Sequence, residues 1–202
     1  ALSSAASDVY KRQTYDAGTT TQLMWGARSD VGCVRPHNED SYLVQSPLFC
    51  VCDGMGGHAA GEVASSIAVE TIAKTAPQSA DAARLAAAVE AANAAVIEAA
   101  LNGLGKPGMG CTATCAYIEN DTLAIAHVGD SRAYLLHEGT LIRVTRDHSY
   151  VEELVDAGEI TADEARVHPN RSVITRALGS DPAMYADHFT PVSYTHLDAA
   201  DD

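Results

Sequence analysis

Three short acidic segments of this chain combine residue types that can bind a cation. They read RPHNED, CDGMGGH and HVGDSRAY, and each has the composition of a tight loop or of the end of a strand. Carboxylate and carbonyl oxygens suit Mg²⁺ or Mn²⁺, and the segments lack the thiolate or histidine set that zinc prefers. The candidate functional residues that they supply are Arg35, Glu39, Asp40, Asp53, Gly54, His58 and Asp130.

The segment around Asp53 gives the clearest local signal. It follows the apolar run LFCVC, which predicts a buried strand, and precedes Gly54, Gly56 and Gly57. Glycine serves where the backbone takes a positive φ or passes close to a ligand. An aspartate between a buried strand and such a turn therefore favours a cation site. Taken singly, each acidic segment also fits an ordinary solvated loop.

The predicted elements that must position these segments are strands, then two helices, then more strands. Apolar residues repeat at helical spacing in some segments and alternate in others, and short turns between successive strands imply antiparallel pairing. This segregation predicts an α+β fold. We expect a strand at 48–52, helices at 61–75 and 81–101, strands at 111–118, 122–128, 132–137 and 140–145, and helical segments at 150–160 and 161–169.

The chain resembles the metal-dependent PPM or PP2C-type protein serine/threonine phosphatases of bacteria. SDVGCVRPHNEDS, VCDGMGGHAAGE, GMGCTAT, AHVGDSRAYLL and TRDHS are similar to five motifs of that family, in the same order, and HPNRSVITRALGS to the segment that follows. The resemblance implies a β-sandwich of two antiparallel sheets flanked by helix pairs. It also implies an enzyme, a hydrolase that dephosphorylates phosphoserine and phosphothreonine by attack of a metal-bridging hydroxide.

The resemblance implies a metal-binding role for five of the candidates. Asp53 would bridge two Mn²⁺ or Mg²⁺ ions, and the carbonyl of Gly54 would bind one of them. Glu39 would hold a metal-bound water, with Asp40 supporting it from behind. Asp130 would contribute to a third, weaker metal site found in bacterial relatives.

Two further candidates are expected to act on the substrate. The resemblance makes Arg35 the group that grips the phosphate, a task that suits its planar fork of donors. His58 matches the histidine proposed as general acid to the leaving alkoxide. From the residues alone, Arg35 could instead form a surface ion pair with Glu39, and His58 could be a solvated loop residue. Three other histidines are expected to be structural: His127, His148 and His168.

The chain departs from the family pattern after residue 180. The family places two more metal-binding aspartates there, in SDG-like and DN-like motifs, and neither motif is present. We therefore expect residues 14–191 to form a partial domain that lacks its last strands and terminal helix, binds metal weakly and has little activity. Residues 1–13 and 192–202 are expected to be non-native, because DVYKRQ and VSYTHLD resemble two halves of one translated adapter peptide.

Composition limits the partners and the compartment. The 202 residues carry a formal net charge of −14, with 27 acids and 13 bases, which argues against nucleic acid or an anionic membrane as partner. No apolar run reaches the length of about 18 residues that a membrane-spanning helix needs. The five cysteines have no C-x-x-C spacing, so we expect small buried hydrophobes in a reducing cytoplasm. The resemblance implies a monomer that acts on phosphorylated substrates of a serine/threonine kinase.

Two other functions stay open at this point. A non-catalytic, pseudophosphatase-like binding module or an inactive fragment is the first alternative, although a docking domain has no need of Arg35, Glu39, Asp53 and Asp130. A nucleotide-binding protein is the second. It is disfavoured because DGMGGHAAG lacks the G-K-[ST] of a P-loop.

Overall fold

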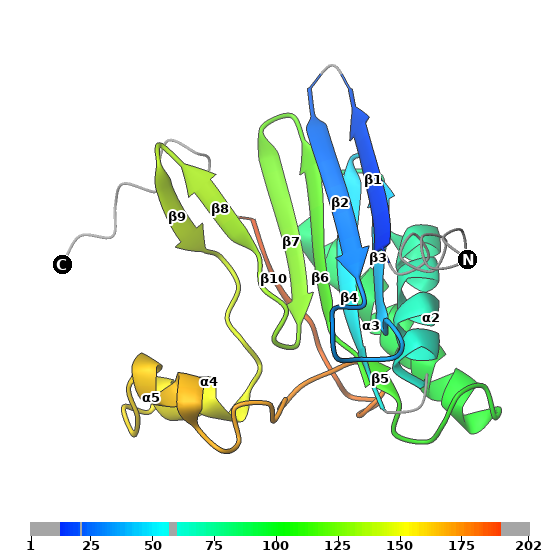
Figure 1. Cartoon of the computed structure of the whole chain (residues 1–202). Coiled ribbons are helices and arrows are strands. Elements are labelled where there is room, and N and C mark those ends of the chain that lie inside the picture. The colour runs from blue at the N-terminus through cyan, green and yellow to red at the C-terminus, as the bar shows by residue number, and fades with distance from the viewer. Residues whose placement is uncertain (1–12, 21, 57–59, 191–202) are drawn as a thin grey trace, which may run out of the picture.

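One antiparallel sheet forms the centre of the structure. The computed structural model describes residues 13–20, 22–56 and 60–190. The sheet has the order β10-β7-β6-β4-β3, and β5 pairs with the end of β4 (Figure 1). Its strands are β3 (Asp40–Gln45), β4 (Leu48–Met55), β5 (Gly110–Cys111), β6 (Ala113–Glu119), β7 (Thr122–Val128) and β10 (Asp187–Phe189).

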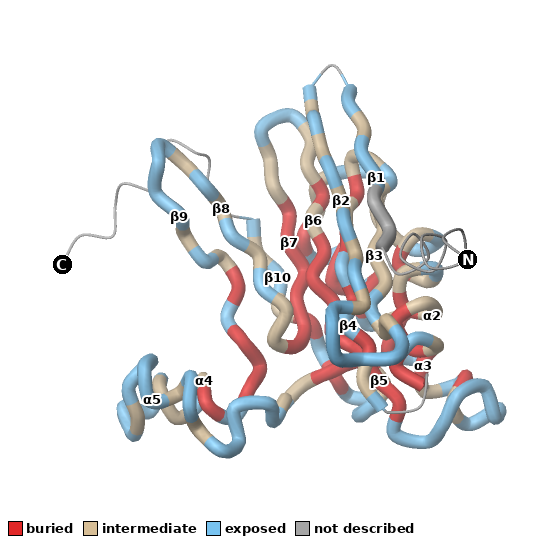
Figure 2. The backbone as a smooth tube through the Cα atoms, in the orientation of Figure 1, coloured by how far each residue is buried: buried red, intermediate tan, exposed pale blue. Residues whose placement is uncertain are grey.

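Two antiparallel helices, α2 (Ala60–Thr75) and α3 (Ala82–Leu101), cover one face of this sheet (Figure 1). Helix α3 begins after Asp81, whose carboxylate accepts the N–H of Arg84, as expected of a capping residue. Buried residues concentrate where the helices face β4, β6 and β7 (Figure 2). Small side chains at i,i+4 spacing on α2, among them Ala64 and Ala68, are fully buried and let the helix approach the sheet closely.

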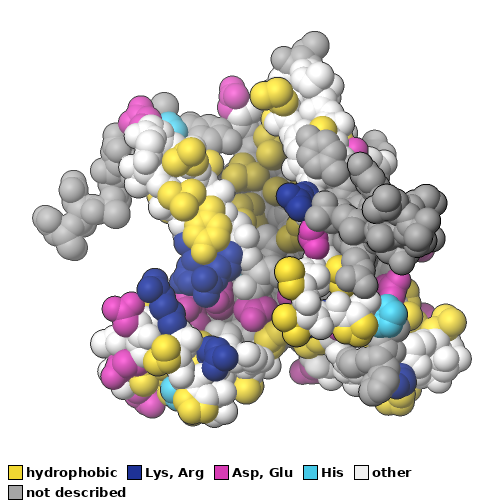
Figure 3. All heavy atoms as spheres, in the orientation of Figure 1, with side chains coloured by type: hydrophobic (Ala, Val, Ile, Leu, Met, Phe, Trp, Pro, Cys, Tyr) yellow, Lys and Arg dark blue, Asp and Glu magenta, His cyan; other side chains and the backbone are white. Residues whose placement is uncertain are grey.

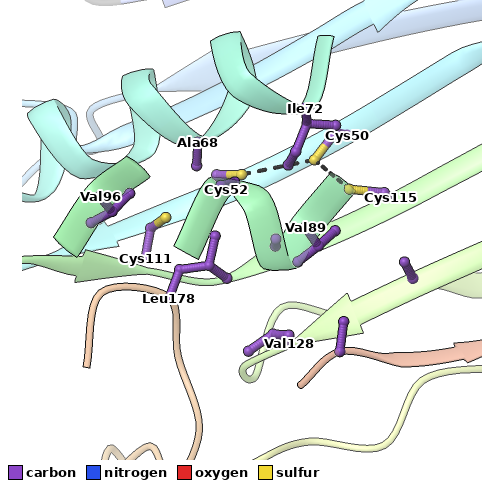
Figure 4. Packing of buried hydrophobic residues seen from close by; sticks show 14 of the residues in the cluster. Cys50, Cys52, Ala68, Ile72, Val89, Val96, Cys111, Cys115, Val128 and Leu178 are labelled. Carbon is purple, nitrogen blue, oxygen red and sulfur yellow. Dashed lines mark hydrogen bonds between the residues drawn. The ribbon is translucent and has the colours of Figure 1, made fainter. Parts of the chain in front are cut away.

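Four of the five cysteines belong to the core, as predicted: Cys50, Cys52, Cys111 and Cys115. The Sγ atoms of Cys50 and Cys115 lie 2.9 Å apart across β4 and β6, and all five thiols are free (Figure 4). The contact with the Cys115 thiol, together with burial, raises the pKa of the Cys50 thiol, so it stays protonated and packs as an apolar group. The prediction was wrong for Cys33, which is exposed in the loop before β3.

Among the described residues, two separate hairpins lie outside the central sheet. Strand β1 (Gln13–Thr19) pairs with β2 (Met24–Asp30). Trp25 of β2 packs edge-on against Phe49 of β4, with the two ring centroids 6.1 Å apart. Strand β8 (Tyr134–His137) pairs with β9 (Thr140–Arg143). The meander predicted for these strands stops after β7, because Gly129 takes a φ of 106° and turns the chain out of the sheet.

A small lobe follows the second hairpin. It contains α4 (Tyr150–Asp156), which ends earlier than predicted, and α5 (Ala162–Val167), which begins with a capping box between Thr161 and Glu164. The lobe lies below the β8–β9 hairpin and apart from α2 and α3 (Figure 1). No helix in the described ranges is both long and apolar enough to cross a membrane.

Candidate active site

Asp40 and Asp53 face each other at one end of the central sheet. They are register partners across β3 and β4. Strand β4 continues past the predicted end at residue 52, because Gly54 and Met55 pair with β5. The Asp53 side chain reaches solvent, yet partial burial and the neighbouring Asp40 carboxylate together raise its pKa to about 6. Two carboxylates in this position repel each other and would be stabilised by a cation.

The backbone beside Asp53 is held by contacts between distant parts of the chain. The Gly54 N–H donates to the carbonyl of Glu39 at 3.2 Å, and the Ser65 hydroxyl donates to the same oxygen at 2.7 Å. A Cβ on Gly54 would lie 2.2 Å from the carbonyl oxygen of Gly61 and 2.4 Å from that of Glu39. Glycine is therefore required here because α2 and the loop before β3 approach the strand, and not because φ is positive.

Thr112, which sequence analysis did not single out, joins Asp53 to the segment that holds Asp130. Its Oγ1 accepts the Asp53 N–H at 3.0 Å and lies 2.6 Å from the hydroxyl of Ser131, and its own N–H donates to the Asp53 carbonyl at 2.9 Å. Thr112 is 1% exposed, and a Cβ on Gly129 would come within 2.5 Å of it. The sequence feature that could have pointed to Thr112 was its position in the GMGCTAT motif.

Asp130 lies close enough to Asp53 for their charges to interact. Burial raises the pKa of Asp130, and the carboxylates of Asp147 and Asp53 raise it further. Asp40, Asp53 and Ser131 together line a pocket of about 260 Å³ on this side of the sheet. The structure therefore brings three of the predicted acidic residues, Asp40, Asp53 and Asp130, into one neighbourhood.

Arg35 stands at the edge of this neighbourhood. Its side chain is 70% exposed and lies 3.8 Å from the Glu39 carboxylate, so the ion pair considered from the sequence is present. The guanidinium also lowers the pKa of Asp53, opposing the effects of burial and Asp40. Exposure leaves the forked donor accessible to an anion from solvent. His58 lies outside the described residues.

His127 and His148 are structural, as predicted. His148 accepts the Gly129 N–H at Nδ1 (3.0 Å) and contacts the Asp187 carboxylate through Nε2 (3.0 Å). His127 lies between Thr114 and the Arg146 carbonyl, each 2.9 Å away. Burial lowers the pKa of both imidazoles. His168 accepts the N–H of Asn170 at Nδ1, and its ring lies 5.9 Å from that of Tyr150, centroid to centroid.

The acidic residues supply carboxylate oxygens, which are the ligands that a hard divalent cation prefers. They make up only part of the ligands that such an ion needs. Among the residues that the structure describes, no group of three or more His, Cys, Asp or Glu side chains is arranged to hold a metal ion. Asp53 and Asp40 bring two carboxylates together, and a cation would relieve the repulsion between their like charges.

Sequence comparison assigns the family. The family model described as Protein phosphatase 2C matches residues 25–190, so the chain belongs to the protein phosphatase 2C family. It is 44% identical over 165 residues to the serine/threonine protein phosphatase PstP of Mycobacterium tuberculosis, covering 80% of this chain and 32% of PstP. It is 38% identical over 174 residues to the serine/threonine phosphatase stp of Listeria welshimeri, covering 80% of this chain and 69% of that protein. The chain thus spans about a third of the length of the mycobacterial relative.

Solved structures confirm the predicted α+β, PP2C-like fold. The crystal structure of the Mycobacterium tuberculosis phosphatase PstP/Ppp matches with a TM-score of 0.74 and 37% identity, covering 89% of this chain and 72% of that one. The PstP catalytic domain in complex with two manganese ions matches with a TM-score of 0.70 and 34% identity, over 89% and 72% of the two chains.

Proposed function

We propose that this chain carries the catalytic region of a metal-dependent phosphatase that hydrolyses phosphoserine and phosphothreonine in proteins. The observation that carries the proposal is the meeting of Asp40, Asp53 and Asp130 at one end of the sheet, in a member of a phosphatase family. The substrates would be proteins phosphorylated by a serine/threonine kinase. The enzyme would be cytoplasmic, since its buried free thiols fit a reducing compartment. It would act as a monomer, as the family resemblance implies.

The chain's own residues would divide the work between metal and substrate. Asp53 and the Gly54 carbonyl would hold Mn²⁺ or Mg²⁺, Glu39 would hold a metal-bound water supported by Asp40, and Asp130 would contribute to a third, weaker site. When bound, two such ions would lower the pKa of the attacking water and neutralise charge on the phosphate. Arg35 would bind the phosphate oxygens through its exposed fork. His58 would protonate the leaving alkoxide, which has a high pKa.

The partial ligand set supports a second candidate, a non-catalytic binding module or an inactive fragment. The two candidates are separated by assaying the gene product that contains this sequence with p-nitrophenyl phosphate and a phosphothreonine peptide. We expect turnover that requires Mn²⁺ or Mg²⁺ and stops in excess chelator. Undiminished turnover in chelator would refute the metal mechanism, and peptide binding without turnover in Mn²⁺ would favour the binding module.

Replacement of Thr112 by valine tests the link between Asp53 and Ser131. Valine keeps the shape of the buried side chain but removes the Oγ1 that accepts the Asp53 N–H. Loss of a residue that orients a metal ligand costs about 10- to 100-fold in metal affinity or activity. We expect a loss of about tenfold in Mn²⁺ affinity, measured by calorimetric titration.

The conservative variant Thr112→Ser is the control, because it keeps the hydroxyl. It should bind Mn²⁺ nearly as well as the unsubstituted protein. If serine and valine weaken binding equally, the lost packing and not the hydrogen bond is responsible, and Thr112 does not position Asp53.

A further inference from the structure

A second pocket lies beside the acidic residues, between the β8–β9 hairpin and the lobe of α4 and α5. Its volume is about 590 Å³. Four arginines line it: Arg132, Arg143, Arg166 and Arg171. The chain has 13 lysines and arginines and a net charge of −14, so this pocket gathers nearly a third of its bases at one place. Figure 3 shows Lys and Arg side chains between the hairpin and the lobe, with Asp and Glu side chains beside them.

Two of the arginines are already neutralised within the pocket. Arg132 holds Asp147 through two nitrogens: Nε lies 2.9 and 3.0 Å from the two carboxylate oxygens, and Nη2 donates to one of them. Arg143 pairs with Glu152 and lies 3.9 Å from Asp147. Asp147 is 4% exposed, so these ion pairs lie at the buried base of the pocket. They neutralise Arg132 and Arg143, which therefore have little charge left to bind a ligand.

The other two arginines have charge available. Arg166 lies 3.3 Å from Asp163, but both side chains are largely exposed, and water screens such a pair so that it binds weakly. Arg171 donates to the backbone carbonyl of His168 at 3.4 Å. In the part of the chain that is described, no carboxylate oxygen lies within 4.0 Å of the Arg171 guanidinium. Ser172, next to it, also lines the pocket.

The arginine pocket and the pocket at Asp53 meet across one turn. Asp130 and Arg132 line the larger pocket, while Ser131, between them, lines the smaller one with Asp40 and Asp53. A peptide whose phosphorylated residue is held at Asp53 would therefore place neighbouring residues over this turn. Those residues would reach the arginine pocket.

We propose that the arginine pocket is a specificity subsite for an acidic side chain that flanks the phosphorylated residue of the substrate. The occupant would be an oxyanion, either a carboxylate or a second phosphate. Arg171 would supply a bidentate fork, which matches both anions, and Arg166 would add charge from α5. The inference rests on the proposed function, because it takes the phosphorylated residue to lie at Asp53.

Binding of non-hydrolysable phosphonate peptides in Mn²⁺ tests the subsite without turnover. Fluorescent peptides with a phosphonate analogue of phosphothreonine would carry glutamate, a phosphonate analogue of phosphoserine or glutamine at each flanking position in turn, and Kd would be measured by fluorescence anisotropy. The best acidic peptide should bind at least about fivefold more tightly than its glutamine counterpart, since hydrogen bonds to charged groups stabilise more than neutral ones. Comparison of the glutamate and phosphoserine-analogue peptides identifies which anion is preferred.

Arg171→Gln should abolish this preference, and Arg166→Gln should reduce it. The matched control is Arg84→Gln, which removes one charge from an exposed arginine on α3, outside the pocket, and should keep the preference. Equal affinity for acidic and neutral peptides, or an equal loss in the Arg84 variant, would overturn the proposal. Hydrolysis of p-nitrophenyl phosphate by the unsubstituted protein with Mn²⁺ tests the proposed function separately.

Discussion

Replacement of Asp53 by asparagine is expected to reduce phosphatase activity of the gene product by at least about a thousandfold. Asp53 is the residue assigned to both metal ions, and metal ions contribute several kcal/mol of transition-state stabilisation. Asparagine keeps the size of the side chain but removes its charge. The measurement is kcat/KM for p-nitrophenyl phosphate over a range of Mn²⁺ concentrations. If activity returned in full at high Mn²⁺, Asp53 would contribute to metal affinity and not to the chemical step.

The same substitution should stabilise the metal-free protein. Because the pKa of Asp53 is raised to about 6, the folded state binds a proton more tightly than the unfolded state, whose carboxyl has a pKa near 3.8. Stability therefore falls as pH rises from about 4 to about 6, and the cost persists above that range. After a discount for solvent screening, this cost is about 1 kcal/mol, or about 2–4 °C in melting temperature.

Thermal melting in chelator at pH 5 and pH 7.5 measures this effect. At pH 7.5, Asp53→Asn should melt at a higher temperature than the unsubstituted protein, and the difference should shrink towards pH 4. A variant that is less stable at pH 7.5 would show that Asp53 makes stabilising contacts that outweigh its repulsion from Asp40.

Replacement of Gly54 by alanine should have the largest effect on folding. The added Cβ would lie 2.2 Å and 2.4 Å from two backbone oxygens, on Gly61 and Glu39, and neither can move like the end of a side chain. Overpacking typically costs about 1–3 kcal/mol, and we expect about 3 kcal/mol or more here. The measurement is the free energy of unfolding in urea.

Gly26→Ala is the matched control, because its Cβ would have ordinary clearance, with the nearest atom 3.9 Å away. It should leave stability unchanged or raise it by about 0.4–1 kcal/mol, since alanine restricts the unfolded chain. A loss of similar size in both variants would mean that glycine-to-alanine changes are costly throughout this chain, and the close contact at Gly54 would then not be the cause.

Local sequence determined most of the elements and the chemical type of the site. The apolar periodicity predicted the two long helices and the strands β6 and β7. These features depend on neighbours a few residues apart, so they can be read from short windows of sequence. The clustering of Asp, Glu and Gly also indicated an oxygen-rich cation site before any contact was known.

Tertiary structure decided how the site is built. The hydrogen bond from Asp53 to Thr112 joins residues 59 positions apart, and no local pattern predicts it. The need for glycine at position 54 comes from Gly61 and Glu39, and the departure of the β8–β9 hairpin from the central sheet follows from the conformation of Gly129. The grouping of arginines into one pocket likewise appears when a hairpin, a loop and two short helices pack together. Sequence fixes which groups a chain carries and its local periodicity, whereas packing between distant segments sets the distances on which charge, hydrogen bonding and steric exclusion depend.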